Sequence, residues 1–376
     1  ALASQSAGIT GVSHHARPTV AIFYISIFLA SAVFMRIGQK RKNRLFLLIS
    51  LLIPILASGL RYNVGTDFKN YENIYNGIVP NLDLKGYMTY GPTELGIYFI
   101  SNIGIALNLD SWFMFTAFSA LTILPIYYGI KNFNLKHPST AYLLYLLVIF
   151  PVSFNAVRQL AAMSMVFLSV SLLYKRKNIA AIIPFIAAVI VHKSSLILLV
   201  FLPAILMFIY KTNFKFREIF SMFIVGTAIL LGGSAIFSTF MQSSIFSDYS
   251  QYSSTSNAAA GSMLMLKFII FSVFLTLIIM GKFHKLAYSR LFIAMSFLEI
   301  TMLVIGLSSV DISRFAMYFS VFSLLFIPSI TEVFTRQVQR PILLLVLLYG
   351  LIMFFMQYFV LKGSDIFPYQ SIFGGF

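Results

Sequence analysis

The sequence predicts an all-α, polytopic integral membrane protein with about 12–14 transmembrane helices. Of its 376 residues, 59% are hydrophobic and 10% are charged, whereas a soluble domain carries about 25% charged residues. Its 27 Lys and Arg residues exceed its 11 Asp and Glu residues, which gives a net charge of +16. A nucleic-acid-binding protein would not dilute that charge among 40 Phe and 20 Tyr residues. We therefore expect no nucleic-acid partner, and apolar spans in a lipid bilayer that are joined by basic loops.

About thirteen apolar runs are long enough to be considered as spans, because a spanning helix needs roughly 20 mainly apolar residues. They are residues 20–37, 45–60, 94–109, 111–130, 140–154, 156–173, 178–191, 194–210, 219–236, 263–281, 290–308, 314–331 and 341–361. Residues 1–19 are small and polar, and we expect them to be a disordered tail or one introduced for expression. Residues 20–376 then form a single helical membrane domain with outer-face loops at 61–93 and 238–262.

Clusters of Lys and Arg predict the orientation of the chain. They lie at 40–44, 131–136, 175–177, 211–217, 282–290 and 336–340. Cytoplasmic loops are enriched in Lys and Arg, so we place these clusters in the cytoplasm and interpret the excess charge as a topology signal. The first two clusters can share that face only if an even number of crossings separates them. We therefore expect residues 94–109 to enter from outside and return, or to lie along the interface; the alternative is that the first cluster is external.

A polar segment begins where the second span ends and contains Arg61 and Asp67. Asp67, Tyr71 and Tyr75 have i, i+4, i+8 spacing, so a helix here would carry a carboxylate and two phenols on one face. The tyrosines also fit an interfacial aromatic belt. For Arg61 with Asp67 we favour a functional role.

A second group of polar residues lies at the start of the sixth span. Asn155, Arg158 and Gln159 have i, i+3, i+4 spacing, which predicts two amides and a guanidinium on one helix face. An Arg at mid-membrane costs at least ~2.5 kcal/mol, and it is tolerated where it faces a cavity or an anion. Snorkelling to the outer interface is the alternative. Arginine is disfavoured on the outer face by the positive-inside bias, so we favour anion binding.

His192 is the only one of five histidines that we place at an outer-face helix junction. The reference pKa of a histidine, ~6.5, suits a general base near neutral pH. The alternative role is that of a packed, hydrogen-bonding residue. Glu299 lies inside an apolar span, where an acidic residue is a functional candidate by default or pairs with a buried amide.

Further polar residues stand at predicted outer ends of spans. Around the start of the twelfth span stand Asp311, Arg314 and Tyr318. Asp311 and Arg314 could alternatively form only a local ion pair. Tyr249 and Tyr252 lie in the Ser-rich loop 238–262, where they would stack on sugar rings or anchor the loop.

The sequence lacks the motifs that are typical of several classes of catalytic and metal-binding site. There is no Cys, no phosphate-binding glycine loop, no Asp-x-Asp pair and no His-Glu-x-x-His motif. We therefore expect metal-independent chemistry without a cofactor, in which arginines supply the counter-charge.

Six motifs resemble the EpsG/Wzy-like family of bacterial O-antigen and exopolysaccharide polymerases. They occur in the family's order across residues 61–373. They are Arg61-x-x-x-Gly65-x-Asp67-x-x-x-Tyr71, Glu94-x-Gly96, Asn155-x-x-Arg158-Gln159-x-x-Ala162, His192-x-Ser194, Arg314-x-x-x-Tyr318 and Pro368-Tyr369-Gln370-Ser371-Ile372-Phe373.

The resemblance implies a GT-C-like fold in the bacterial inner (plasma) membrane, with the active site facing the periplasm or cell exterior. It implies transfer of a sugar chain from undecaprenyl diphosphate to another lipid-linked repeat unit, and a chain-length regulator protein as a partner. Arg158, helped by Arg61 or Arg314, would bind the diphosphate, and His192 or Asp67 would deprotonate the acceptor hydroxyl. The expected substrate-binding residues are Tyr71, Glu94, Asn155, Gln159, Tyr249, Tyr252, Asp311, Tyr318 and Tyr369.

Three other functions use similar residues. An O-antigen ligase would transfer the chain to a different lipid, and an acyltransferase would modify the polysaccharide. A lipid-linked oligosaccharide flippase or other transporter is the non-enzymatic alternative, although it would favour internal repeats and charges near the membrane midplane.

Overall fold

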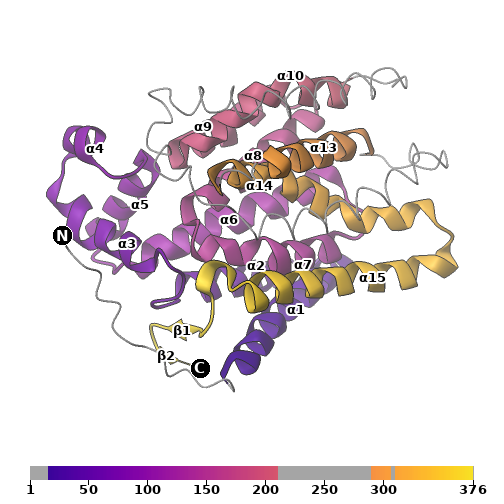
Figure 1. The fold of residues 1–376 in the computed structure, drawn as a ribbon, viewed down its shortest axis with the longest axis horizontal. Helices are drawn as coiled ribbons and strands as arrows, with labels where there is room; N and C mark the ends of the chain where they lie inside the picture. Colours follow the sequence, from indigo (N-terminus) through magenta and orange to yellow (C-terminus); the bar gives the residue numbers. More distant parts are fainter. Residues whose placement is uncertain (1–15, 211–288, 306–309, 376) are drawn as a thin grey trace. The chain divides into compact units, whose positions relative to one another are not determined.

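The computed structural model describes residues 16–210, 289–305 and 310–375, and these residues form an all-α membrane protein (Figure 1). Six helical segments within this part of the chain are long and apolar enough to cross a membrane. They are Val20–Arg41, Trp112–Phe133, Val157–Tyr174, Lys193–Tyr210, Arg314–Val333 and Arg336–Val360. The predicted all-α, polytopic class is therefore confirmed. The predicted spans 219–236 and 263–281 and the loop 238–262 lie outside the described residues.

The helices begin and end close to the predicted spans, because apolar runs of this length bury their backbone polar groups only as helices. They are α1 (Ala16–Arg41), α2 (Arg44–Gly59), α3 (Phe68–Asn73), α4 (Leu84–Tyr90), α5 (Leu95–Ala106), α6 (Trp112–Phe133), α7 (Pro138–Val148), α8 (Val157–Tyr174), α9 (Asn178–Val191), α10 (Ile197–Tyr210), α13 (Ser289–Ile305), α14 (Val310–Phe326) and α15 (Arg336–Phe354).

Short irregular elements interrupt or extend the helices. The 3-10 turns are Val79–Asn81, Phe150–Phe154, Lys193–Leu196, Ile327–Val333 and Gly363–Asp365, and the π-helical turns are Ile74–Ile78 and Phe355–Val360. Near the C-terminus, β1 (Gln370–Ser371) and β2 (Gly374–Gly375) form a small antiparallel pair.

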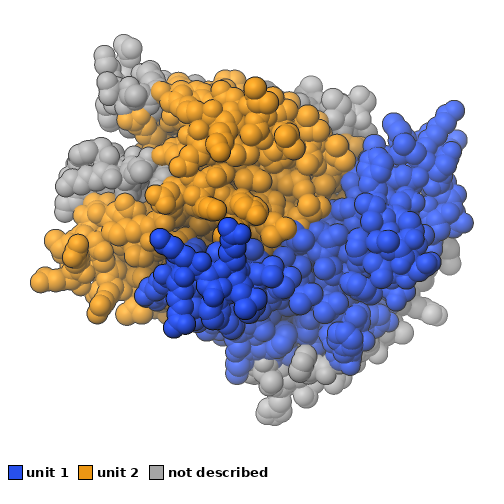
Figure 2. Space-filling model, turned by 180° about the vertical axis from the view of Figure 1, so that it is seen from behind, with its two compact units in different colours: residues 1–120, 146–157, 350–376 blue, residues 121–145, 158–349 orange. Residues whose placement is uncertain are grey.

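The chain divides into two compact units, which are coloured separately in Figure 2. Unit 1 is Ala1–Ala120, Leu146–Val157 and Gly350–Phe376. Unit 2 is Leu121–Tyr145 and Arg158–Tyr349. Each unit therefore combines segments that are distant in the sequence.

The helices α1 and α2 form a helical hairpin in unit 1. The Ser31 hydroxyl donates to the Ser50 carbonyl at 2.6 Å, and the Phe34 and Phe46 rings stack with centroids 6.0 Å apart. The side chain of Asn43 accepts a hydrogen bond from the Leu45 amide at 2.8 Å and so caps the start of α2. The basic cluster at 40–44 thus lies at a tight helix-to-helix turn.

An aromatic core joins α1 to the C-terminal segment within unit 1. The Tyr24 ring lies with its centroid 5.8 Å from that of Phe154, 5.8 Å from Phe367 and 5.7 Å from Tyr369. Its hydroxyl donates to the Ile366 carbonyl at 3.0 Å. These contacts hold residues 366–369 against α1, more than 300 residues away in the sequence.

Unit 2 is built around the buried helix α8. The Phe167 ring of α8 lies 4.9 Å from Phe322 of α14, and Phe326 of α14 lies 6.2 Å from Phe292 of α13. Figure 1 shows α13 and α14 running side by side. Aromatic rings thus link α8 to α14 and α14 to α13.

The segment that the charge pattern predicts not to cross completely is a short helix. With 12 residues, α5 is about 18 Å long, whereas the hydrocarbon core of a bilayer is about 30 Å thick. Because α7 has only 11 residues and also belongs to a predicted span, length does not distinguish the two, and the incomplete crossing of α5 stays a prediction.

Labelling of single cysteines tests the predicted orientation, because the chain has no cysteine of its own. We expect Lys40→Cys and Lys136→Cys to react with a membrane-impermeant thiol reagent only after cells are permeabilised. Lys69→Cys should react in intact cells and serves as the matched control. Labelling of Lys40→Cys in intact cells would instead place the first basic cluster outside.

Candidate functional site

Arg61 lies at the centre of a hydrogen-bonded cluster in unit 1 and is 1% exposed. Its Nη1 donates to the Ser58 carbonyl at 2.5 Å and to the Ser58 hydroxyl at 3.1 Å. Its Nε donates to the Val64 carbonyl at 3.2 Å, and its Nη2 donates to the Phe154 carbonyl at 3.2 Å. One side chain thereby joins the end of α2, the following loop and the 3-10 turn Phe150–Phe154. We call Ser58, Arg61, Val64, Gly65 and Phe154 the Arg61 cluster.

Aromatic rings cover the Arg61 guanidinium. Its carbon Cζ lies 4.5 Å from the centroid of the Phe115 ring and 5.0 Å from that of Phe154, and both distances are typical of cation–π contacts. Burial lowers the pKa of Arg61 to about 10. The group therefore stays protonated at neutral pH, and all its N–H groups remain donors.

Gly65 allows the loop to close on this cluster. Its φ of +94° is in the region that favours glycine, and a Cβ built on it would lie 2.3 Å from the Phe154 carbonyl oxygen. Its amide donates to the Asp365 carbonyl at 3.2 Å. The Arg61-x-x-x-Gly65 spacing is thus explained by one close backbone approach.

The C-terminal segment pairs with the same loop. The Tyr62 amide donates to the Gln370 carbonyl at 2.9 Å, and the Ile372 amide donates to the Leu60 carbonyl at 3.0 Å. Arg61 and Ser371 form an isolated antiparallel bridge between these bonds. The sixth motif of the sequence is therefore joined to the first by backbone hydrogen bonds.

Asn155 fixes the exposed part of the loop. Its side-chain oxygen accepts from the Asp67 amide at 3.1 Å and from the Thr66 hydroxyl at 2.5 Å. The side chain of Asp67 is exposed and stands at the N-cap position of α3 without making a capping hydrogen bond. Asn155 thus positions the loop that presents the Asp67 carboxylate.

Other predicted binding residues of unit 1 serve in packing. Tyr71 is 5% exposed and meets the Phe115 ring edge to face. Tyr369 is 4% exposed, and its hydroxyl donates to the Ala57 carbonyl at 3.0 Å. Burial raises the pKa of Tyr369, so this hydroxyl stays protonated. Glu94 is half-buried at the N-cap position of α5.

A second group of predicted residues meets in unit 2. His192, which is 8% exposed, lies between α9 and the 3-10 turn Lys193–Leu196 with extended φ and ψ of −160° and 117°. Two residues later, the Ser194 hydroxyl lies 2.7 Å from the Tyr318 hydroxyl of α14. The Ser195 hydroxyl lies 3.2 Å from the same oxygen. The histidine and tyrosine motifs are therefore adjacent.

A further hydrogen bond brings the arginine motifs together. The Gln159 amide nitrogen donates to the Arg314 carbonyl at 3.1 Å, so α8 and α14 meet where Arg158 and Arg314 stand. Arg158 is half-buried and Arg314 is exposed. We call Arg158, Gln159, His192, Ser194, Arg314 and Tyr318 the helix-junction site. Two cations and an imidazole suit the binding of an anionic group next to a hydroxyl that loses a proton.

Glu299 lies deeper in unit 2 and is 1% exposed. Its two carboxylate oxygens accept hydrogen bonds from the Ser320 and Ser323 hydroxyls. The carboxylate thus holds α13 to α14 one turn beyond Tyr318.

Two predictions of a shared helix face are wrong. Since α8 begins at Val157, Asn155 lies before the helix, at φ −109° and ψ −64°, and does not share a face with Arg158 and Gln159. The segment after Asp67 is helical only to Asn73 and continues as a π-helical turn, so Asp67 is exposed while Tyr71 and Tyr75 are buried. Tertiary hydrogen bonds and burial override the local spacing in both places.

The remaining predicted residues are placed as follows. Asp311 lies in the first turn of α14. Tyr249 and Tyr252 lie outside the described residues. No group of three His, Asp or Glu residues in the described ranges could hold a metal ion. Residues that the sequence did not indicate are Ser58 and Phe115, since a helix-end serine and a core phenylalanine carry no signal of their own.

Replacement of Arg61 tests the role of the Arg61 cluster. We expect Arg61→Lys to lower the free energy of unfolding by about 2–4 kcal/mol, because lysine leaves several buried carbonyls without a donor. Thermal unfolding of the purified protein in detergent measures the change. Lys69→Ala, which alters an exposed cation of α3, should have little effect. Equal stability of Arg61→Lys and wild type would contradict a structural role.

No curated protein and no solved structure matches the chain. The model of the EpsG family matches residues 44–371, a range that includes both the Arg61 cluster and the helix-junction site. This match covers most of the 376 residues. The chain therefore belongs to the EpsG family.

Proposed function

We propose that this chain is a polysaccharide polymerase of the bacterial inner membrane, with its active site on the outer face. It transfers a growing sugar chain from undecaprenyl diphosphate to the non-reducing-end sugar of another lipid-linked repeat unit. One observation carries the proposal. The hydrogen bonds Gln159–Arg314 and Ser194–Tyr318 bring together three of the family-like motifs, from α8, the 3-10 turn after α9, and α14.

The helix-junction site provides the charges that this reaction needs. A hydroxyl oxygen of the acceptor attacks C1 of the growing chain, and the bond between C1 and the phosphate oxygen breaks with its electron pair leaving on undecaprenyl diphosphate. Arg158 and Arg314 neutralise the charge that develops there. Arg61 is not assigned this task, because its guanidinium is buried and donates to carbonyls of its own chain.

A base accepts the proton that the attacking hydroxyl loses. His192 belongs to the same unit as both arginines, and Asp67 belongs to unit 1, on a loop held by Asn155. His192 is our first choice because Ser194, two residues later, is hydrogen-bonded to Tyr318 in the unit that also contains Arg158 and Arg314. Asp67 is the alternative base. Glu94 and Gln159 are proposed to orient sugars, and a chain-length regulator is the proposed protein partner.

Reconstitution with purified lipid-linked repeat units tests the function directly. Wild-type protein in liposomes should lengthen them into a ladder of products, and EDTA should leave the rate unchanged. Transfer of the chain to a different acceptor lipid would instead indicate a ligase. Movement of the lipid-linked repeat unit across the membrane without lengthening would indicate a flippase, and acylation of its sugars would indicate an acyltransferase.

Replacement of Arg158 tests the binding of the diphosphate. We expect Arg158→Lys to lower kcat/KM about 10²–10³-fold, because lysine cannot make the paired hydrogen bonds of a guanidinium to phosphate. Arg340→Lys, an exposed arginine of α15, is the matched control and should retain wild-type kinetics. A similar loss in both variants would show that the effect is not specific to the site.

Removal of both possible bases tests the proton transfer. The double variant His192→Ala, Asp67→Ala should lose about 10²–10⁴ in kcat. The two single variants identify the base. The polymerisation rate declines at acid pH because the base becomes protonated, and only the variant that lacks the base should lose this decline. Wild-type polymerisation by the double variant would refute both assignments.

A further inference from the structure

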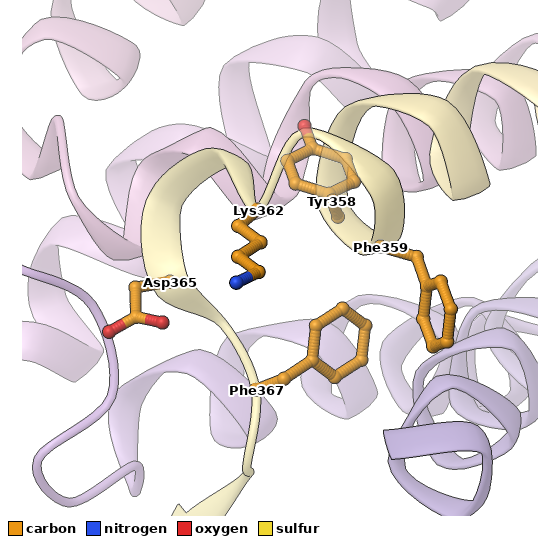
Figure 3. Close-up of a pocket in the computed structure, with 5 residues that line it drawn as sticks. All are labelled: Tyr358, Phe359, Lys362, Asp365 and Phe367. Atoms are coloured by element: carbon orange, nitrogen blue, oxygen red, sulfur yellow. The ribbon is translucent and has the colours of Figure 1, made fainter. Parts of the chain in front are cut away.

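A hollow beside the C-terminal segment of unit 1 is too small to hold part of the substrate. It encloses about 20 Å³, which is room for about one water molecule, and Figure 3 shows the side chains around it. Tyr358 in its wall is 1% exposed. Among the described residues, buried hydroxyl groups beside His192 in unit 2 form a better-defined arrangement.

Three of these hydroxyl groups form a chain of hydrogen bonds, and one placement of their protons satisfies all the bonds. The Ser195 hydroxyl lies 3.2 Å from the Ala188 carbonyl, which can only accept, so Ser195 donates in this bond. Each hydroxyl has one proton, so Tyr318 donates in its 3.2 Å contact with Ser195. Ser194 then donates in its 2.7 Å contact with Tyr318. The chain therefore runs from Ser194 through Tyr318 and Ser195 to Ala188.

Burial makes each bond of this chain necessary. Ser195 is 0% exposed, and Ser194 and Tyr318 are each 2% exposed. A buried hydroxyl without a partner is destabilising, because it has given up its hydrogen bonds to water without a replacement. The Tyr318 hydroxyl is used once as an acceptor and once as a donor within the protein. The position of Ser195 therefore depends on that of Tyr318 in α14.

Ser195 contacts the His192 backbone on both sides, once directly and once through a shared carbonyl. The Ser195 amide donates to the His192 carbonyl at 3.1 Å. The His192 amide donates at 2.8 Å to the Ala188 carbonyl, which also accepts from the Ser195 hydroxyl. His192 has an extended backbone between α9 and the 3-10 turn, so the helix does not continue through it. The contacts of Ser195 thus fix the place at which the imidazole leaves the chain.

We propose that Ser195 is a positioning residue for His192 and that Tyr318 ties both to α14. The catalytic consequence rests on the proposed function, in which His192 is the base. Arg314 stands four residues before Tyr318, about 6 Å along α14. The chain of hydroxyls therefore connects the segment that carries the base to the helix that carries a proposed ligand of the diphosphate. Because Ser195 is fully buried, it acts through His192 and not on the substrate.

The kinetics of Ser195→Ala test whether this serine acts through His192. We expect kcat to fall about 10–100-fold with KM unchanged, because a misplaced base slows proton transfer and leaves substrate binding intact. In a His192→Ala background the same change should have no further effect, since the residue to be positioned is absent. Ser169→Ala is the matched control. Its buried hydroxyl donates to the Ala181 carbonyl of α9 at 2.7 Å, and its loss should leave kcat unchanged.

The reactivity of His192 with diethyl pyrocarbonate supplies a readout that needs no enzymatic activity. His192 is 8% exposed, and its carbethoxylation in the purified full chain is followed by mass spectrometry of peptides. Ser195→Ala should raise the rate at His192 about tenfold, the factor expected when one hydrogen bond no longer opposes exposure of the ring. Tyr318→Phe, which removes only the hydroxyl oxygen, should act likewise. The rate at His137 should not change, nor should the rate at His192 in Ser169→Ala.

Three outcomes would overturn the proposal. They are an unchanged reactivity of His192 in either Ser195→Ala or Tyr318→Phe, a wild-type kcat of Ser195→Ala, and a further fall in kcat when Ser195→Ala is added to His192→Ala. A wild-type kcat of His192→Ala alone would make Asp67 the base and refute the catalytic role of Ser195. If wild-type protein does not lengthen lipid-linked repeat units but the reactivity of His192 changes as expected, the polymerase function is refuted and the positioning of His192 stands.

Discussion

Burial of one guanidinium organises unit 1. Arg61 is 1% exposed, and its desolvation is offset by hydrogen bonds to Ser58, Val64 and Phe154 and by the rings of Phe115 and Phe154. These partners come from the end of α2, the loop after it, α6 and the turn before α8. Because a buried charge is tolerated only when such partners are all in place, the positions of these segments depend on each other. The C-terminal segment then adds backbone hydrogen bonds to both sides of Arg61.

Unit 2 uses hydrogen bonds from hydroxyl groups for a similar purpose. The Tyr318 hydroxyl meets Ser194 and Ser195, and the Glu299 carboxylate accepts from Ser320 and Ser323. Within an apolar bundle such groups must pair with each other, because lipid supplies no donors or acceptors. The result is a set of contacts that fixes α13, α14 and the His192 junction while Arg314 remains exposed. The backbone around Arg314 and His192 is therefore positioned by polar contacts of neighbouring residues.

The helices were predictable from the sequence, whereas the roles of the polar residues were only partly so. The predicted run 178–191 coincides with α9, because apolar length and basic flanks are local properties of the chain. Asn155 was placed on a helix face by its spacing to Arg158, yet its side chain binds the loop at Asp67. Arg61 was given a substrate contact and is a packing residue in the structure. In both cases the deciding partner lies about 90 residues away, since Arg61 and Phe154 are separated by 93 positions.

Sequence alone was enough to predict that this chain is a helical membrane protein, where most of its described spans lie, and which motifs carry its polar residues. Each of these follows from hydropathy, charge and short spacings, which are summed along the chain. Which polar residues are buried to hold loops, and which remain exposed, became clear only from the folded chain. That choice depends on donors and acceptors brought together across long separations, such as the 124 positions between Ser194 and Tyr318. Pairing of buried polar groups is a property of the packed chain, and no local pattern encodes it.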